Sequence, residues 1–98
     1  MTVNAEKIGN KVTLKIEGRL DTTTAPSLEK IINDPPADVT ELVLDMSQLA
    51  YVSSAGLRVL LSAQKKMNKI GSMKLTGVCE EVMEVFEMTG FSDILDIE

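Results

Sequence analysis

Two adjacent serines, Ser53 and Ser54, are the residues of this chain best suited to carry chemistry. They follow the apolar run Leu42-Val43-Leu44, which is typical of a buried strand, and they begin the apolar periodicity of a long amphipathic helix. A hydroxyl on the first turn of a helix is exposed at the positive end of the helix dipole, where a phosphate is tolerated. The pattern therefore indicates a switch, in which one serine of the pair carries a phosphate. In the alternative interpretation the pair only caps the helix, a role worth about 1 kcal/mol.

The chain has few residues that could support catalysis, metal binding or cofactor binding. The chain has no histidine, one cysteine (Cys79) and 3% aromatic residues, and it contains no glycine-rich phosphate-binding motif. We therefore expect a protein that is not an enzyme and that has no cofactor and no metal site. The alternative of a different class is a small nucleotide-binding protein or a weak NTPase. The net charge of -5 argues against binding to nucleic acid, which attracts basic surfaces.

The composition also bears on the compartment. A single cysteine allows no internal disulfide and fits a reducing compartment. No apolar run approaches the roughly 18 residues of a membrane-spanning helix, and the N-terminus lacks a basic-then-apolar signal. We therefore expect a cytoplasmic protein without direct membrane insertion.

The 98 residues predict one α/β domain over 1–98. Gly9-Asn10 predicts a hairpin turn between the first two strands, Gly18–Thr24 reads as a polar loop, and the run Leu42-Val43-Leu44 predicts a central strand covered on both faces. Strands are expected over 2–7, 11–17, 41–46 and 73–78, with a short last strand over 94–97, and helices are expected from the cap Thr24 to Pro35-Pro36, over 54–69 and over 80–89. Strand–helix alternation predicts parallel neighbours in one sheet beside the antiparallel hairpin.

Four segments of this pattern carry a resemblance that extends from the first strand to about Ile97. They are Gly18-Arg19-Leu20-Asp21, Asp45-Met46-Ser47, Ser53-Ser54-Ala55-Gly56-Leu57 and Met88-Thr89-Gly90-Phe91. In their order and spacing they resemble the STAS domain and, more narrowly, the stand-alone bacterial anti-sigma factor antagonists. The resemblance implies a single STAS-like domain with a mixed four- to five-stranded sheet, an N-terminal antiparallel hairpin and three helices.

The resemblance also implies a function. Proteins of this group bind a serine kinase that doubles as an anti-sigma factor, and the sigma factor is thereby released. The kinase phosphorylates one serine at the start of the helix, which breaks the complex, and a serine phosphatase resets the protein. Matched to the family motif, the phosphorylated serine falls on Ser54, which leaves Ser53 as the expected cap. The loop aspartate of the partner-contact surface falls on Asp21.

The partner surface that this resemblance implies is expected to be made by Asp21, Thr22, Thr23, Ser53, Ser54, Gly56 and Arg58 in a protein that is monomeric when free. Two of these residues depart from the best-known relatives, which have an aspartate in place of Ser53 and a small residue in place of Arg58. Arg58 lies one helical turn beyond Ser54, where it could reach a phosphate, contact a partner or be solvated. Asp21 could simply form a turn, and Gly56 could serve close packing. The alternative function is a STAS scaffold subunit of a membrane transporter or signalling complex, with Ser54 never modified.

Overall fold

The computed structural model describes residues 1–33 and 39–98, so the expected helix end at Pro35-Pro36 lies outside the described residues. The three expected helices and four of the expected strands are present. In chain order the elements are β1 (Thr2–Ile8), β2 (Lys11–Leu20), α1 (Ala25–Asn33), β3 (Glu41–Val52), α2 (Ser54–Ile70), β4 (Ser72–Thr76), α3 (Glu80–Thr89) and a 3₁₀ turn over Phe91–Asp93.

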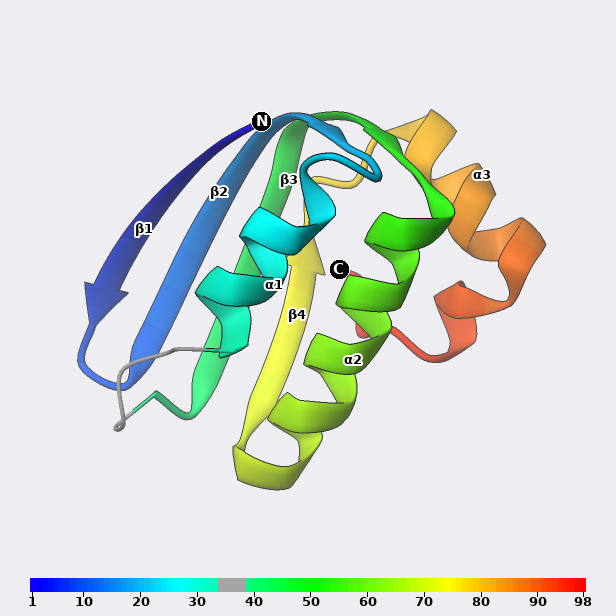
Figure 1. Ribbon diagram of the computed structural model, residues 1–98. Helices are drawn as coiled ribbons and strands as arrows, with labels where there is room; N and C mark the ends of the chain where they lie inside the picture. Colours follow the sequence, from blue (N-terminus) through cyan, green and yellow to red (C-terminus); the bar gives the residue numbers. More distant parts are fainter. Residues whose placement is uncertain (34–38) are drawn as a thin grey trace.

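The four strands form one mixed sheet in the order β1-β2-β3-β4 (Figure 1). β1 and β2 pair antiparallel through the expected turn at Gly9-Asn10, while β3 lies parallel to both β2 and β4. Gly9 adopts φ +62°, a left-handed conformation that favours glycine. Because β2, β3 and β4 run in the same direction, their carboxyl ends meet at one edge of the sheet. The chain segments that follow these strands start from that edge.

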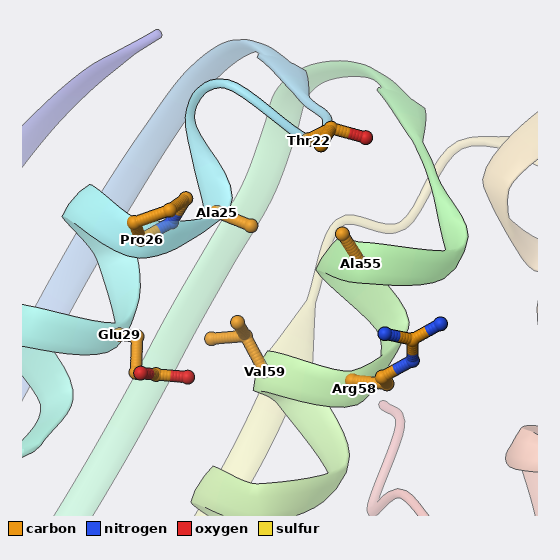
Figure 2. Close-up of a pocket in the computed structure, with 7 residues that line it drawn as sticks. All are labelled: Thr22, Ala25, Pro26, Glu29, Ala55, Arg58 and Val59. Atoms are coloured by element: carbon orange, nitrogen blue, oxygen red, sulfur yellow. The ribbon is translucent and has the colours of Figure 1, made fainter.

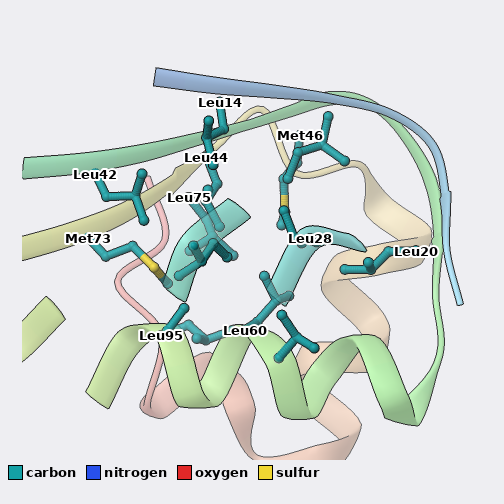
Figure 3. Packing of buried hydrophobic residues seen from close by; sticks show 14 of the residues in the cluster. Leu14, Leu20, Leu28, Leu42, Leu44, Met46, Leu60, Met73, Leu75 and Leu95 are labelled. Atoms are coloured by element: carbon teal, nitrogen blue, oxygen red, sulfur yellow. The ribbon is translucent and has the colours of Figure 1, made fainter. Parts of the chain in front are cut away.

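The core lies between one face of the sheet and the helices α1 and α2, which lie side by side across it (Figure 1). Alternate strand residues point into this layer, and Leu60 of α2 meets them from the other side (Figure 3). The buried strand residues on this face include Val12, Leu14, Ile16, Leu42, Leu44, Met46, Met73 and Leu75.

The opposite face of the sheet is polar, which corrects the expectation that the central strand is covered on both sides. β3 is central, but its Val43 is only half-buried and lies between Thr13 of β2 and Lys74 of β4. One apolar residue among polar neighbours on the outer face of a strand gives the same short apolar run as a strand buried on both faces. The run alone therefore could not distinguish the two arrangements.

β2 is longer than the sequence predicts, and this matters for the site. The strand continues through Gly18 and Arg19 to Leu20, so the expectation of a loop from Gly18 was wrong, and the loop is limited to residues 21–24. Two register shifts, at Lys15/Glu17 and at Gly18/Arg19, let the polar segment stay paired with β3. They place Leu20 opposite Val52 and bury it completely. β3 likewise continues beyond Met46 to Val52.

The expected last strand over 94–97 is reduced to one parallel bridge between Leu75 and Ile97. The Leu75 N–H donates to Asp96 O at 2.8 Å, and the Glu98 N–H donates to Leu75 O at 2.9 Å. The buried side chain of Gln64 accepts a hydrogen bond from the Asp96 N–H at 3.2 Å. The sheet therefore has four strands, with the C-terminal segment tied to β4 and to α2.

The helices bury the faces that their periodicity predicts, with small differences. In α1, Leu28 and Ile32 are buried, whereas Ile31 is exposed. α2 ends at Gly71, whose N–H donates to Met67 O at 2.7 Å. A Cβ at Gly71 would lie 1.7 Å from Thr40 O, so close backbone packing requires glycine there. Within the described residues, no helix has the length and apolar character needed to cross a membrane.

Candidate functional site

The end of β2 is joined directly to the start of α2. The Ser53 N–H donates a hydrogen bond of 2.8 Å to Leu20 O. The Leu20 side chain then packs over Gly56, where an added Cβ would lie 2.7 Å from Leu20 Cγ and 3.0 Å from Leu20 O. Two segments more than thirty residues apart are thereby fixed side by side, namely the loop after Leu20 and the first turn of α2.

The two serines at the start of α2 have different surroundings. Ser53 has extended backbone angles (φ -91°, ψ 174°), and its Oγ accepts a hydrogen bond from the Gly56 N–H at 3.3 Å, which confirms it as the cap. Ser54 is the first residue of α2 and is exposed. Its hydroxyl makes no hydrogen bond to any residue that the structure describes. The first turn also contains no acidic side chain, so the exposed hydroxyl lies at a helix end that favours negative charge.

Asp21 organises the loop beside this helix end. Its Oδ1 accepts hydrogen bonds from the Thr23 hydroxyl at 2.8 Å, the Thr23 N–H at 3.0 Å and the Thr24 N–H at 3.2 Å. The hydrogen bond from the Thr23 hydroxyl is the largest cause that lowers the pKa of the Asp21 carboxyl below its ordinary value. Desolvation comes next and raises the pKa, and the N–H groups of Thr23 and Thr24 lower it further. Asp21 thus stabilises the turn in the free protein, and its contact with a partner stays a prediction.

Thr24 connects the same loop back to β2. Its hydroxyl lies 2.8 Å from Arg19 O, to which it donates, and it accepts from the Asp21 N–H at 2.8 Å. Thr24 occupies the expected N-cap position, because α1 begins at Ala25 and the Leu28 N–H donates to Thr24 O at 3.3 Å. Among the bonds described, however, its hydroxyl points backward and accepts no N–H of the helix. The α1 start is held instead by the Ala25 N–H, which donates to Asp21 O at 2.8 Å.

Arg19 and Tyr51 form a contact beside the loop that sequence patterns did not predict. The Arg19 guanidinium lies 4.2 Å from the centroid of the Tyr51 ring, a cation–π geometry, and Arg19 Nε is 3.8 Å from Asp21 Oδ2. The two residues are opposite each other in the parallel pairing of β2 with β3. Only the shifted register brings them together, so no local signal in the sequence could have identified the pair.

A hollow of about 220 Å³ separates the starts of α1 and α2 (Figure 2). Thr22 from the loop and Ala55 from the first turn of α2 stand at its mouth, and Val59 lies deeper between the helices. The remaining lining residues are Ala25, Pro26, Glu29 and Arg58. The structure thus brings two residues of the expected surface, Thr22 and Arg58, to one hollow. Sequence reasoning missed Pro26, Glu29 and Val59, because only the packing of α1 beside α2 gives them a common position.

The other residues expected in the partner surface are not among those that line this hollow. Asp21 is partly exposed and Thr23 is exposed, with its hydroxyl bonded to Asp21. Gly56 is buried beneath Leu20, which fits the close-packing alternative. Their contact with a partner stays a prediction.

The comparison with known families agrees with this fold over nearly the whole chain. The model of the STAS domain matches residues 2–98. The protein belongs to the STAS domain family. This confirms the resemblance carried by the four sequence segments.

The similar proteins described next are all named as anti-sigma factor antagonists. This STAS domain is 29% identical over 98 residues to the anti-sigma-B factor antagonist of Bacillus subtilis, covering 99% of this chain and 90% of that protein. It is 27% identical over 86 residues to the anti-sigma-B factor antagonist of Staphylococcus aureus, covering 86% and 80% of the two chains. An anti-sigma factor antagonist from Mycobacterium paratuberculosis has a similar structure, with a TM-score of 0.87, 25% identity and coverage of 98% of this chain and 83% of that chain.

Replacement of Gly56 tests the packing that joins the two segments. We expect Gly56→Ala to lower the free energy of unfolding by about 1–3 kcal/mol, because the new Cβ overlaps the buried Leu20 side chain and its carbonyl. This is opposite to the usual gain of about 0.5–1 kcal/mol for alanine over glycine in a helix. Urea denaturation measures the change, and Ser62→Ala at an exposed position of α2 is the control. A Gly56→Ala protein as stable as the parent would contradict the packing argument.

The Asp21 loop gives a prediction for pH. The lowered pKa means that the loop bonds stabilise the folded state above the ordinary pKa of an aspartate, and that this stabilisation is lost as pH falls through the folded-state pKa. An NMR titration of the Asp21 carboxyl carbon should give a pKa below the ordinary range, and Thr23→Val should raise it toward that range. Thr22→Val, on an exposed neighbour, should leave it unchanged. Equal Asp21 pKa values in the parent and Thr23→Val proteins would show that the hydroxyl is not the cause.

Proposed function

We propose that this STAS domain is an anti-sigma factor antagonist controlled by phosphorylation of Ser54. In its unmodified form it binds an anti-sigma factor that is also a serine kinase, and the phosphorylated form releases that partner. A serine phosphatase restores the binding form. The names of the similar proteins support the class of function. The observation that carries the switch is the exposed Ser54 hydroxyl, left without a bond in the described structure while Ser53 supplies the cap.

The modification is a phosphoryl transfer for which Ser54 supplies only the nucleophile. The bond between Ser54 Oγ and the γ-phosphorus of ATP forms, the bond from that phosphorus to the leaving oxygen of ADP breaks, and the hydroxyl proton passes to a base of the kinase. Hydrolysis by the phosphatase returns the serine and inorganic phosphate. This chain therefore needs no cofactor and no catalytic residue for either step.

Charge at an interface explains how the phosphate ends binding. A phosphoserine adds a charge of about -1.5 to -2 at pH 7. The start of α2 tolerates that charge, because its free N–H groups and dipole favour an anion, so the fold is retained. In a desolvated contact with an acidic or apolar partner surface, the same charge is unpaired and costs several kcal/mol. A loss of about 3 kcal/mol already weakens affinity more than a hundredfold.

The binding surface in this proposal is the loop after Leu20 together with the first turns of α2. It comprises Asp21, Thr22, Thr23, Ser53, Ser54 and Arg58, while the buried Gly56, also expected in this surface, supports it from below by packing against Leu20. The bond between Ser53 and Leu20 and the hydrogen bonds of Asp21 support it, because they hold both segments in one arrangement before a partner arrives. We place this activity in the cytoplasm, with a monomer as the free form, and the net charge of -5 supports a protein partner rather than nucleic acid.

Phosphorylation should occur once, at Ser54. We expect incubation with the anti-sigma factor kinase of the source organism and ATP–Mg to add a single phosphate to the parent protein and none to Ser54→Ala. Ser53→Ala should still be modified, although the lost cap costs about 1 kcal/mol of stability. Intact-mass spectrometry counts the phosphates and peptide mapping locates them. Phosphate on Ser53 or Thr22 would refute the assignment of Ser54.

Mimicry of the phosphate should weaken binding without unfolding the protein. We expect Ser54→Asp to lower affinity for the kinase at least tenfold, about 1.4 kcal/mol, because it places a negative charge in the contact. Ser62→Asp makes the same change at an exposed position two turns further along α2, and it should bind like the parent. Isothermal calorimetry measures affinity, and circular dichroism with thermal unfolding checks the fold. An Ser54→Asp protein that unfolds would show that the serine is structural.

The loop should contribute to the same contact. We expect Asp21→Ala to lower affinity at least tenfold as well. Asp21→Asn keeps an oxygen that can accept the loop hydrogen bonds while removing the charge, so it separates the two roles of the residue. Loss of binding in both variants assigns the effect to the charge, and loss only in Asp21→Ala assigns it to the shape of the loop. Parent affinity in both variants, with Ser54→Asp still impaired, would confine the interface to α2.

A further inference from the structure

Arg58 lies where a side chain can reach over the first turn of α2. It is exposed and follows Ser54 by four residues in the same helix. Residues at this spacing lie one above the other, and helical side chains lean toward the N-terminus of the helix. Figure 2 shows the Arg58 guanidinium raised from its own turn toward the turn that precedes it.

The charge of Arg58 has no counter-ion in the described structure. No carboxylate oxygen of residues 1–33 or 39–98 forms an ion pair with its guanidinium, and the first turn of α2 contains no acidic residue. Glu29 of α1 lines the same hollow, but Val59 lies between the two side chains (Figure 2). The guanidinium is therefore free to bind an anion that appears at Ser54.

We propose that Arg58 is the intramolecular counter-ion of phosphorylated Ser54. This inference rests on the proposed phosphorylation and adds a residue that regulates its effect. A guanidinium presents its N–H donors in a planar fork that fits two phosphate oxygens, and a dianionic phosphate pairs with it more strongly than a monoanion does. The pair spans one turn of α2 and needs no movement of the backbone.

The pairing gives the modification a second effect on the binding surface. Phosphorylation adds negative charge at Ser54 and also withdraws the positive charge of Arg58 from any acidic group of the partner. The phosphate is held against α2 beside the mouth of the hollow between α1 and α2. Arg58 is thus a regulatory residue that acts through the phosphate.

The test uses the full chain with phosphoserine inserted at position 54 during synthesis, so that it does not depend on a kinase. A ³¹P NMR titration follows the second ionisation of the phosphate, whose ordinary pKa is about 6. Pairing favours the dianion and lowers this pKa, so Arg58→Gln should raise it by about 0.5, roughly a threefold change in the ionisation constant. Arg58→Lys, which keeps the charge without the fork, should give an intermediate value.

Lys65→Gln is the matched control, because it removes the same charge from another exposed position of α2. Lys65 is eleven residues from Ser54, about 16 Å along the helix and beyond the screening length of about 10 Å at 0.1 M salt, so the phosphate pKa should not change. Circular dichroism establishes that each variant is folded. The same phosphate pKa in the folded parent and Arg58→Gln proteins would overturn the pairing. A kinase that leaves Ser54 unmodified would instead refute the proposed function and leave this measurement intact.

Discussion

The contact between Leu20 and the start of α2 is the constraint on which the rest of the site depends. One backbone hydrogen bond, from the Ser53 N–H to Leu20 O, joins the ends of two parallel strands, and the buried Leu20 side chain fills the space that Gly56 leaves open. The loop that follows Leu20 and the helix that follows Ser53 therefore start from a common fixed point. Removal of either component would weaken this junction, although the Leu20 side chain and Gly56 are themselves buried.

In the proposed switch, the adjacent serines divide two tasks, capping by Ser53 and modification at Ser54. A hydroxyl engaged as a cap accepts a backbone N–H and is held close to the helix, which makes it a poor nucleophile for another protein's active site. Because Ser53 makes that bond, the Ser54 hydroxyl stays outside and unengaged in the described structure. The two carboxylate oxygens of Asp21 are divided in a similar way. Oδ1 accepts the hydrogen bonds of the loop, and Oδ2 faces Arg19 and solvent. The proposed binding surface is thus ordered in the free protein, which would reduce the entropy lost on association.

Patterns of neighbouring residues predicted much of the fold. The features that they did not predict depend on contacts between segments that are distant in the sequence. The hairpin at Gly9-Asn10, the cap Ser53 and the helix end at Gly90 are set by residues adjacent in sequence, and each was predicted. The end of β2 was not, because two register shifts keep a glycine-containing polar segment paired, and pairing depends on the neighbouring strand. The candidate site was likewise predicted only in part. Ser54 could be identified from its position at the start of the helix, but the hollow beside it exists only because α1 packs next to α2.

The separation of buried residues that hold the site in place from exposed residues of the proposed binding surface has a consequence for the evolution of binding specificity. Leu20, Val52 and Gly56 are buried and hold the geometry, so substitutions there affect folding and recognition together. Thr22, Ser54 and Arg58 are exposed on the outside of that frame. Exposed substitutions usually change stability by less than about 0.5 kcal/mol. After a gene duplication, sister copies could therefore acquire separate partners by exchanging a few outward side chains while inheriting the same frame, and cross-talk between them would be limited without any new fold.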